Sequence, residues 1–136
     1  MSYLIDTCAV SELIKLRPHV PVFDWFQATH PEQLFLSSLT LGEIRKGVEG
    51  MASGRRRDRV SAWLETELPG WFEGRILPVS LDVADTWGRL AAQRPTLPVV
   101  DGLIAATARF HRLRVVTRNE TDFARTGVEI VNPWHG

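Results

Sequence analysis

The chain has 136 residues, the length of one compact domain and too short for two, so we expect a single domain over residues 1–136. Sixteen basic and sixteen acidic side chains cancel, so a nucleic-acid partner must be held by a local patch and not by net charge. One cysteine excludes an internal disulfide and no apolar run reaches the roughly 20 residues of a membrane span, which favours a cytoplasmic protein.

The N-terminal segment contains a short apolar run, followed by apolar residues at helical spacing. Residues 3–5 predict a buried strand, and Asp6 follows directly at its carboxyl end. Apolar residues at helical spacing then predict a helix that runs to Arg17-Pro18, because the residue before a proline disfavours the helical region. A second short helix is expected to begin at Pro21.

The next segment repeats this alternation. Residues 34–36 predict a second buried strand. Thr40-Leu41-Gly42-Glu43 matches a capping box, so we expect a helix to begin near its threonine and to end at Ser53-Gly54. Residues 60–68 have the apolar spacing of an amphipathic helix that stops at Pro69-Gly70.

The second half of the chain follows the same scheme. Residues 75–79 predict a third strand, and Ser80 is a candidate cap for the helix after it. Residues 99–111 predict another helix, followed by strands at 113–117 and 128–131. Because parallel neighbours need long crossover connections, strands separated by helices predict an α/β fold with a parallel sheet covered on both faces.

Four acidic residues follow these strands or begin the helices after them: Asp6, Glu43, Asp101 and Asp122, the last in the loop after the fourth strand. In open α/β sheets such residues meet in the crevice beyond the carboxyl ends of the strands. Clustered carboxylates raise one another's pKa unless a cation neutralises them, so the pattern predicts a divalent metal. All-oxygen ligation favours Mg²⁺ or Mn²⁺, and the histidines lack the spacing of zinc ligands.

Each acid also has a purely structural interpretation. Asp6 could cap the next helix, and a capping box requires Glu43 for its own geometry. Asp101 could complement a helix dipole, and Asp122 could cap a closing turn. These interpretations explain each acid separately, but they do not explain why all four are expected at the same end of the sheet.

Four local sequences resemble, in order, the acidic motifs of the PIN-domain ribonucleases. They are Tyr3 to Cys8 (YLIDTC), Leu39 to Gly47 (LTLGEIRKG), Asp101 to Ala108 (DGLIAATA) and Thr117 to Phe123 (TRNETDF). The closing Asn132 to His135 (NPWH) is similar to the same family. The resemblance covers the whole chain, and within the family it is to the short VapC toxins of bacterial toxin–antitoxin pairs.

The resemblance implies a PIN-like three-layer α/β/α sandwich and a Mg²⁺- or Mn²⁺-dependent endoribonuclease. It further implies homodimers and silencing by a VapB antitoxin. Asp6, Glu43 and Asp101 match the metal-binding acids, and Asp122 matches the fourth. This chain has Cys8 where many relatives have Asn, which predicts a weakened contact, and Asn119 where some PIN domains have an acid. Whether Asn119 or Asp122 completes the site is therefore left open.

Other polar residues are candidates for supporting roles. The hydroxyl groups expected next to the metal ligands are those of Thr7, Ser11, Thr40 and Thr117. Candidates for phosphate contacts with RNA are Arg45, Lys46, Arg55, Arg56 and Arg57. A solvated helix junction is the alternative explanation for these basic residues. No histidine lies in the four acidic motifs, which favours metal-activated water and products with 5′-phosphate and 3′-hydroxyl ends.

The main alternative function is that of a binding module. Such a protein would keep the PIN-like fold without catalysis and act by sequestering a partner. Four intact acids argue against this, and a metal titration would separate the two. A phosphotransfer receiver domain would need a lysine late in the chain, but Lys15 and Lys46 both lie in the first half.

Overall fold

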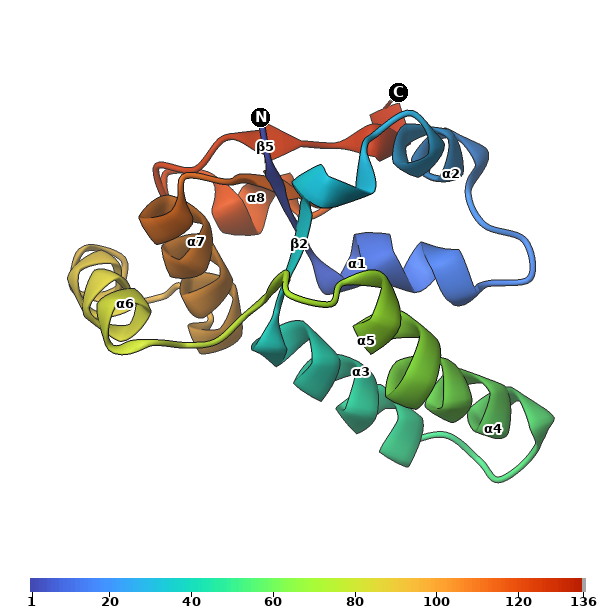
Figure 1. Ribbon diagram of the computed structural model, residues 1–136. Helices are drawn as coiled ribbons and strands as arrows, with labels where there is room; N and C mark the ends of the chain where they lie inside the picture. The colour runs from blue at the N-terminus through green and yellow to red at the C-terminus, as the bar shows by residue number, and fades with distance from the viewer. Residues whose placement is uncertain (136) are drawn as a thin grey trace.

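A central sheet of five parallel strands organises the computed structural model, which describes residues 1–135 (Figure 1). The strands are ordered β3-β2-β1-β4-β5 across the sheet. They are β1 (Tyr3–Ile5), β2 (Leu34–Ser37), β3 (Ile76–Leu77), β4 (Arg114–Val116) and β5 (Ile130–Val131). In the register of the sheet, Tyr3 pairs with Leu34 on one side and with Arg114 on the other. Gly136, the last residue of the expected domain, lies outside the described residues.

Helices connect the strands and cover both faces of the sheet (Figure 1). The longer ones are α2 (Val20–Gln27), α3 (Ser38–Glu49), α4 (Arg55–Ala62), α6 (Leu81–Gln93) and α7 (Val99–His111). The short helical segments are α1 (Thr7–Val10), η1 (Ser11–Ile14), η2 (Pro31–Gln33), η3 (Trp63–Glu67), α5 (Leu68–Trp71), α8 (Glu120–Phe123) and η4 (Pro133–His135). No helix in residues 1–135 is long and apolar enough to cross a membrane.

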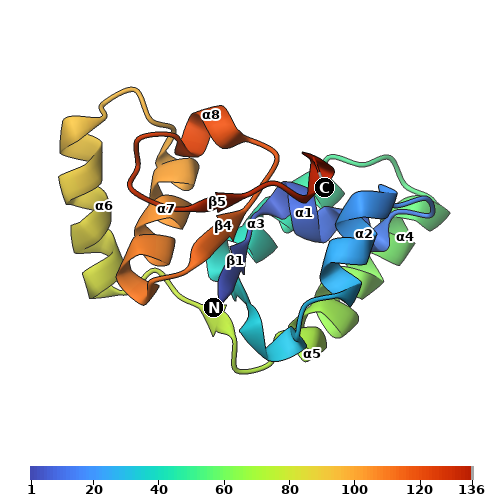
Figure 2. The same cartoon turned by 90° about the horizontal axis from the view of Figure 1, so that it is seen from above.

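Two hydrophobic clusters lie on opposite faces of the sheet. Ile5 and Val116 pack against α1 to α5 on one face, whereas Leu4 and Val115 pack against α6 and α7 on the other. This alternation follows from the two-residue period of a strand. Figure 2 shows α6 and α7 on one side of the strands and α2, α4 and α5 on the other. The expected α/β fold, with a parallel sheet between helices, is therefore confirmed.

Several expected boundaries differ from the structure. The helix expected near Thr40 begins at Ser38, because Ser37 caps it by accepting a hydrogen bond from the Leu39 N–H at 3.1 Å. The prediction of a capping box that begins at Thr40 is therefore wrong. Asp122 lies in the one-turn helix α8 and not in a loop. The helix expected to stop at Pro69-Gly70 continues through both residues, because a proline in the first turn of α5 is not required to donate an N–H.

Candidate active site

Asp6 stands at the carboxyl end of the central strand β1 and is only 5% exposed. Its Oδ1 accepts a hydrogen bond from the Thr7 N–H at 2.9 Å, so the carboxylate does cap α1. Its Oδ2 accepts a second bond from the Thr117 hydroxyl at 2.8 Å. Burial raises the pKa of Asp6 above its usual value in spite of these bonds, and the charge of Asp122 adds to the increase. The carboxylate is thus held by more contacts than a cap requires.

Cys8 and Thr117 complete the surroundings of Asp6. The Cys8 Sγ lies 3.7 Å from Asp6 Oδ2 and 3.6 Å from the Thr117 hydroxyl oxygen. Burial raises the pKa of the Cys8 thiol, which therefore stays protonated and acts as a weak hydrogen-bond donor. The Thr117 hydroxyl is fully buried and also accepts a bond from the Asn119 N–H at 3.0 Å.

Glu43 reaches the same edge of the sheet from the second turn of α3. Its Oε1 accepts a hydrogen bond from the Thr7 hydroxyl at 2.5 Å, across 36 positions of sequence. The side chain therefore faces the start of α1 instead of turning back to its own helix, as the capping-box interpretation required. Thr7 connects the two acids, because its N–H bonds Asp6 and its hydroxyl bonds Glu43.

Asp101 lies in the first turn of α7 and is half-buried. The pKa of its carboxyl is raised to about 6, with burial as the largest cause. The negative charges that add to this increase are those of Asp122, Asp6 and Glu43. All four predicted acids are therefore close enough to interact electrostatically.

The position of α7 depends on close packing against α6. A Cβ atom on Gly102 would lie 3.0 Å from two ring atoms of Trp87, tighter than nearly all real Cβ contacts, and 3.3 Å from a methyl group of Leu97. A side chain at this position would force Trp87 or Leu97 to shift, so glycine suits the close approach of the two helices. Gly102 follows Asp101 directly, so this contact lies in the helix turn that bears the acid.

The acids provide oxygen ligands but do not form a closed metal site by themselves. Within residues 1–135, no group of three or more His, Cys, Asp or Glu side chains is arranged so that it could hold a metal ion. The donor set is nevertheless entirely carboxylate, and burial together with like charges leaves Asp101 favouring its protonated form below about pH 6. A hard divalent cation fits such a set, because it offsets the mutual repulsion.

The three remaining supporting candidates differ in their burial and in their contacts. Thr40 is fully buried, and its hydroxyl has no hydrogen-bond partner in the part of the chain that the structure describes. Ser11 follows α1, and no hydrogen bond joins its side chain to the acids within residues 1–135. Asn119 is exposed, and the bond that it makes to Thr117 comes from its backbone.

The basic candidates for RNA contact divide into two groups. Arg45 forms an ion pair with Glu65 at 2.7 Å, and Arg57 forms one with Glu49 at 3.2 Å. These two arginines connect α3 to the helical segment of residues 55–71. Lys46 is exposed and lines a groove of about 630 Å³ together with Glu43. Two exposed arginines, Arg55 and Arg56, line a different cavity, next to Lys15 and Arg59.

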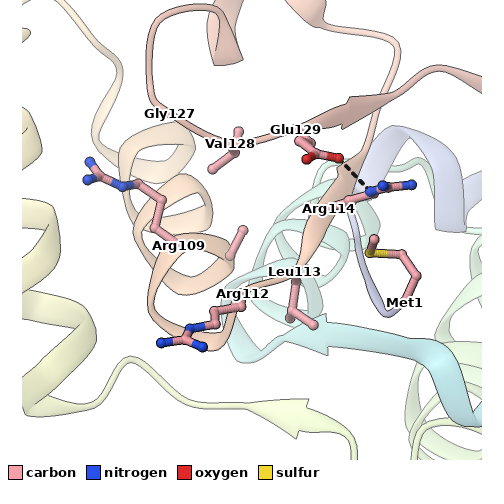
Figure 3. A pocket seen from close by; sticks show the side chains of 9 residues that line it. Met1, Arg109, Arg112, Leu113, Arg114, Gly127, Val128 and Glu129 are labelled. Carbon is pink, nitrogen blue, oxygen red and sulfur yellow. Dashed lines mark ion pairs between the residues drawn. The ribbon is translucent and has the colours of Figure 1, made fainter.

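A basic pocket of about 320 Å³ lies at the opposite, amino-terminal end of the strands (Figure 3). It is lined by Arg109, Arg112 and Arg114, and Arg114 pairs with Glu129 at 2.6 Å. Leu113 and Val128 contribute apolar surface to it. Because the four acids stand at the carboxyl ends, this pocket is not part of their site.

Comparison with known proteins agrees with this architecture. Residues 3–129 match the family described as the PIN domain. The chain belongs to the PIN-domain family. It is 39% identical over 135 residues to the VapC ribonuclease Y4jK of Sinorhizobium fredii, with 96% of each chain covered.

Solved structures of similar proteins share the fold of this PIN domain. FitAcB from Neisseria gonorrhoeae superposes with a TM-score of 0.90 and 33% identity, over 98% of this chain and 99% of that one. A toxin–antitoxin complex from Klebsiella pneumoniae gives a TM-score of 0.70 and 29% identity, over 97% and 98%. The resemblance to VapC-type PIN domains is thereby confirmed.

Three residues that the sequence analysis did not select are connected through Arg118, which lies beside Cys8 in this PIN domain. Arg118 donates its backbone N–H to Cys8 Sγ at 3.5 Å. Its guanidinium lies over the ring of Trp134. Glu12 is a buried acid, and the charge of Arg118 helps to lower the pKa of Glu12. Arg118 was detectable from the sequence, because it belongs to the fourth acidic motif. Glu12 had no such signal.

Replacing Thr117 by Val in this PIN domain should lower the free energy of unfolding by about 1–3 kcal/mol, because the buried Asp6 loses a donor. Thr40→Val is the matched control, since that hydroxyl is equally buried but has no partner among the described residues, and we expect it to be neutral or stabilising. Urea denaturation of both variants measures the difference. Equal losses would show that the bond to Asp6 contributes nothing.

Proposed function

We propose that this chain is a VapC-type toxin, an endoribonuclease that uses Mg²⁺ or Mn²⁺ to hydrolyse RNA phosphodiester bonds. The main support is the mutual electrostatic effect of the four acids at one edge of the sheet, which with burial raises the pKa of Asp101 to about 6. A relative of this chain, 39% identical and matched over almost its full length, is a VapC ribonuclease.

We assign the metal to Asp6, Glu43 and Asp101, with Asp122 as the fourth acid. The charge of Asp122 raises the pKa of both Asp6 and Asp101 in addition to their burial, which supports it over Asn119. When bound, the divalent ion lowers the pKa of a water molecule and neutralises charge on the phosphate.

The residues around the acids hold them in place for this reaction. The Thr7 N–H and the Thr117 hydroxyl orient the two oxygens of Asp6, and the Thr7 hydroxyl orients Glu43. Fixing the carboxylates in advance reduces the reorganisation required when substrate binds. With no histidine among them to activate the ribose hydroxyl, hydrolysis by water leaves 5′-phosphate and 3′-hydroxyl ends.

The same proposal includes the way RNA is held. Of the five predicted contacts, Lys46 has the best position, because it lines the groove that contains Glu43. Arg55 and Arg56 are exposed and would act farther along the RNA, whereas Arg45 and Arg57 are engaged in ion pairs. Surface ion pairs are weak enough for a phosphate to replace the carboxylate.

We further propose that a VapB-type antitoxin neutralises the toxin and that the toxin acts in the cytoplasm as a homodimer, with one PIN domain spanning residues 1–136. The similarity to a chain of a toxin–antitoxin complex supports the antitoxin partner. An antitoxin arginine pairing bidentately with the acids would occupy the place of the metal and block the site.

Expression of the chain alone should arrest bacterial growth, and co-expression of the small protein encoded beside it should restore growth and yield a purifiable complex. The purified chain should cleave RNA, and the complex should not. Asp101→Asn is the control, since it should leave growth normal. Growth arrest by this variant would favour the alternative function, a PIN-like module that acts by sequestering a partner.

A further inference from the structure

Arg118 is fixed to the candidate active site through its backbone. It follows Thr117, whose hydroxyl donates to Asp6 at 2.8 Å, and its own N–H donates to Cys8 Sγ at 3.5 Å. The backbone at this position thus contacts the immediate surroundings of Asp6. Within residues 1–135, no hydrogen bond joins the proposed RNA contacts on α3 and α4 to Asp6 or to a residue bonded to it.

The side chain of Arg118 is held by an aromatic ring. Its Cζ lies 4.6 Å from the centroid of the Trp134 ring. Trp134 packs against the core cluster formed by α1 to α5, and its backbone N–H donates to the Asn132 side-chain oxygen at 3.0 Å. The His19 ring is stacked with the same tryptophan, with centroids 6.5 Å apart. Arg118 therefore rests on an anchored platform and not on a mobile side chain.

A buried carboxylate, that of Glu12, contributes negative charge near this platform. Glu12 is only 2% exposed and accepts hydrogen bonds from the Lys15 ammonium and from the His19 N–H, the latter at 2.9 Å. Burial raises the pKa of Glu12, but these two bonds and the charges of Lys15 and Arg118 together outweigh it, so the pKa lies below its usual value. Glu12 thus favours a positive charge here without forming an ion pair with Arg118.

The guanidinium N–H groups of Arg118 have no hydrogen-bond partner within residues 1–135, so they are free for a ligand. The side chain is exposed, and no ion pair to it occurs within residues 1–135. The donors of a guanidinium lie in its plane, so an aromatic ring stacked on one face leaves the donor edge open. A planar fork of donors matches the oxygens of a phosphate.

The substrate creates a need for such a group. An RNA strand that enters a cluster of four carboxylates is repelled until cations offset their charge. Arg118 lies one residue beyond a group bonded to Asp6, whereas Arg45 and Arg57 are already paired with carboxylates. A fixed cation at this edge would place the strand relative to the acids.

We infer that Arg118, supported by the Trp134 ring, binds a backbone phosphate of the RNA strand that lies in the acidic site. This inference rests on the proposed ribonuclease function and adds a specific substrate contact to it. Trp134 is then a positioning residue, because it acts on RNA through Arg118.

The test measures binding of a labelled single-stranded RNA in an Asp101→Asn background, which keeps the RNA intact. Arg118→Ala should weaken binding about tenfold and reduce the slope of log K against log salt by roughly 0.7, the value for one phosphate contact on a single strand. Trp134→Leu should weaken binding less and leave the slope unchanged, because the charge remains. Arg89→Ala is the matched control, since Arg89 is exposed on α6 and paired with Asp85.

Several outcomes would overturn the inference. One is that Arg118→Ala leaves both the RNA affinity and the salt slope unchanged, although the protein with Asp101 intact cleaves RNA. Another is a lowered melting temperature with an unchanged slope, which would make Arg118 a structural support for the C-terminal segment. A third is weaker antitoxin capture with normal RNA binding. If the unmodified protein neither cleaves nor binds RNA, the proposed function fails and the inference fails with it.

Discussion

Asp101→Asn is expected to reduce RNA cleavage by more than about 100-fold, since mutation of residues that only orient metal ligands already lowers metal affinity or activity about 10–100-fold. Asn keeps the shape of the side chain but removes the charge. If Asp101 served only as a first-turn acid for the helix dipole, the loss of its charge would leave activity nearly unchanged. Cleavage of a labelled RNA with Mg²⁺ or Mn²⁺ measures the effect.

The same variant should become more stable than the wild type as pH rises. The folded-state pKa of Asp101 is raised from 3.8 to about 6, so between these values the folded protein binds more protons than the unfolded chain. Stability contributed by this group is then present below pH 4 and is lost as pH rises through 6. The melting temperature of Asp101→Asn should therefore exceed that of the wild type at pH 8, by a margin that shrinks towards pH 4.

A matched control for this substitution lies on the neighbouring helix. Asp82 also occupies the first turn of its helix, but it is exposed, and its charge is not among those that raise the pKa of Asp101. Asp82→Asn should leave cleavage and its pH dependence unchanged. In the same assay, Asp122→Asn should lose more activity than Asn119→Ala. Wild-type cleavage by Asp101→Asn would limit that acid to a structural role.

Removal of divalent metal is expected to abolish cleavage completely, because the carboxylates alone cannot activate water at neutral pH. Mg²⁺ or Mn²⁺ should also raise the melting temperature, since an ion that binds only the folded state stabilises it by about 2.7 kcal/mol at 100 times its Kd. The increase should be larger at pH 8 than at pH 5, where protonation of Asp101 competes with the metal.

Thermal denaturation at the two pH values checks this without reference to activity. Asp101→Asn, purified in parallel, should show a reduced metal-dependent increase and also reports any contaminating nuclease. Undiminished cleavage in excess EDTA by the wild type, with none by the variant, would rule out the metal mechanism. A metal-dependent increase of the same size in both proteins would remove Asp101 from the ligand set.

The sequence alone predicted that the strands are parallel and that the acids stand at their carboxyl ends, whereas the order of the strands came only from the structure. The apolar runs at 3–5 and 34–36, and the pair Val115-Val116 within 113–117, occur because strands covered on both faces need apolar side chains on both. Since parallel strands share their direction, an acid after each strand must come to the same edge. These inferences need only local pattern and chain direction, and the structure agrees with them.

Local pattern was insufficient where two residues competed for the same role. Thr40 and Ser37 are both good helix caps, and the choice depended on where β2 ends in the sheet. Because the strand continues to Ser37, that residue caps α3, Thr40 is buried within the helix, and Glu43 is released from the capping box. A pairing between strands thus decided a helix boundary.

Only the tertiary structure decided which side chains act together. Thr7 reaches Glu43 across 36 positions and Thr117 reaches Asp6 across 111, and no periodicity in the sequence indicates either bond. The same holds for the stacking of Arg118 on Trp134. A hydrogen bond or a stacked pair requires distances fixed to a few tenths of an ångström, and those distances are set by packing of the whole core.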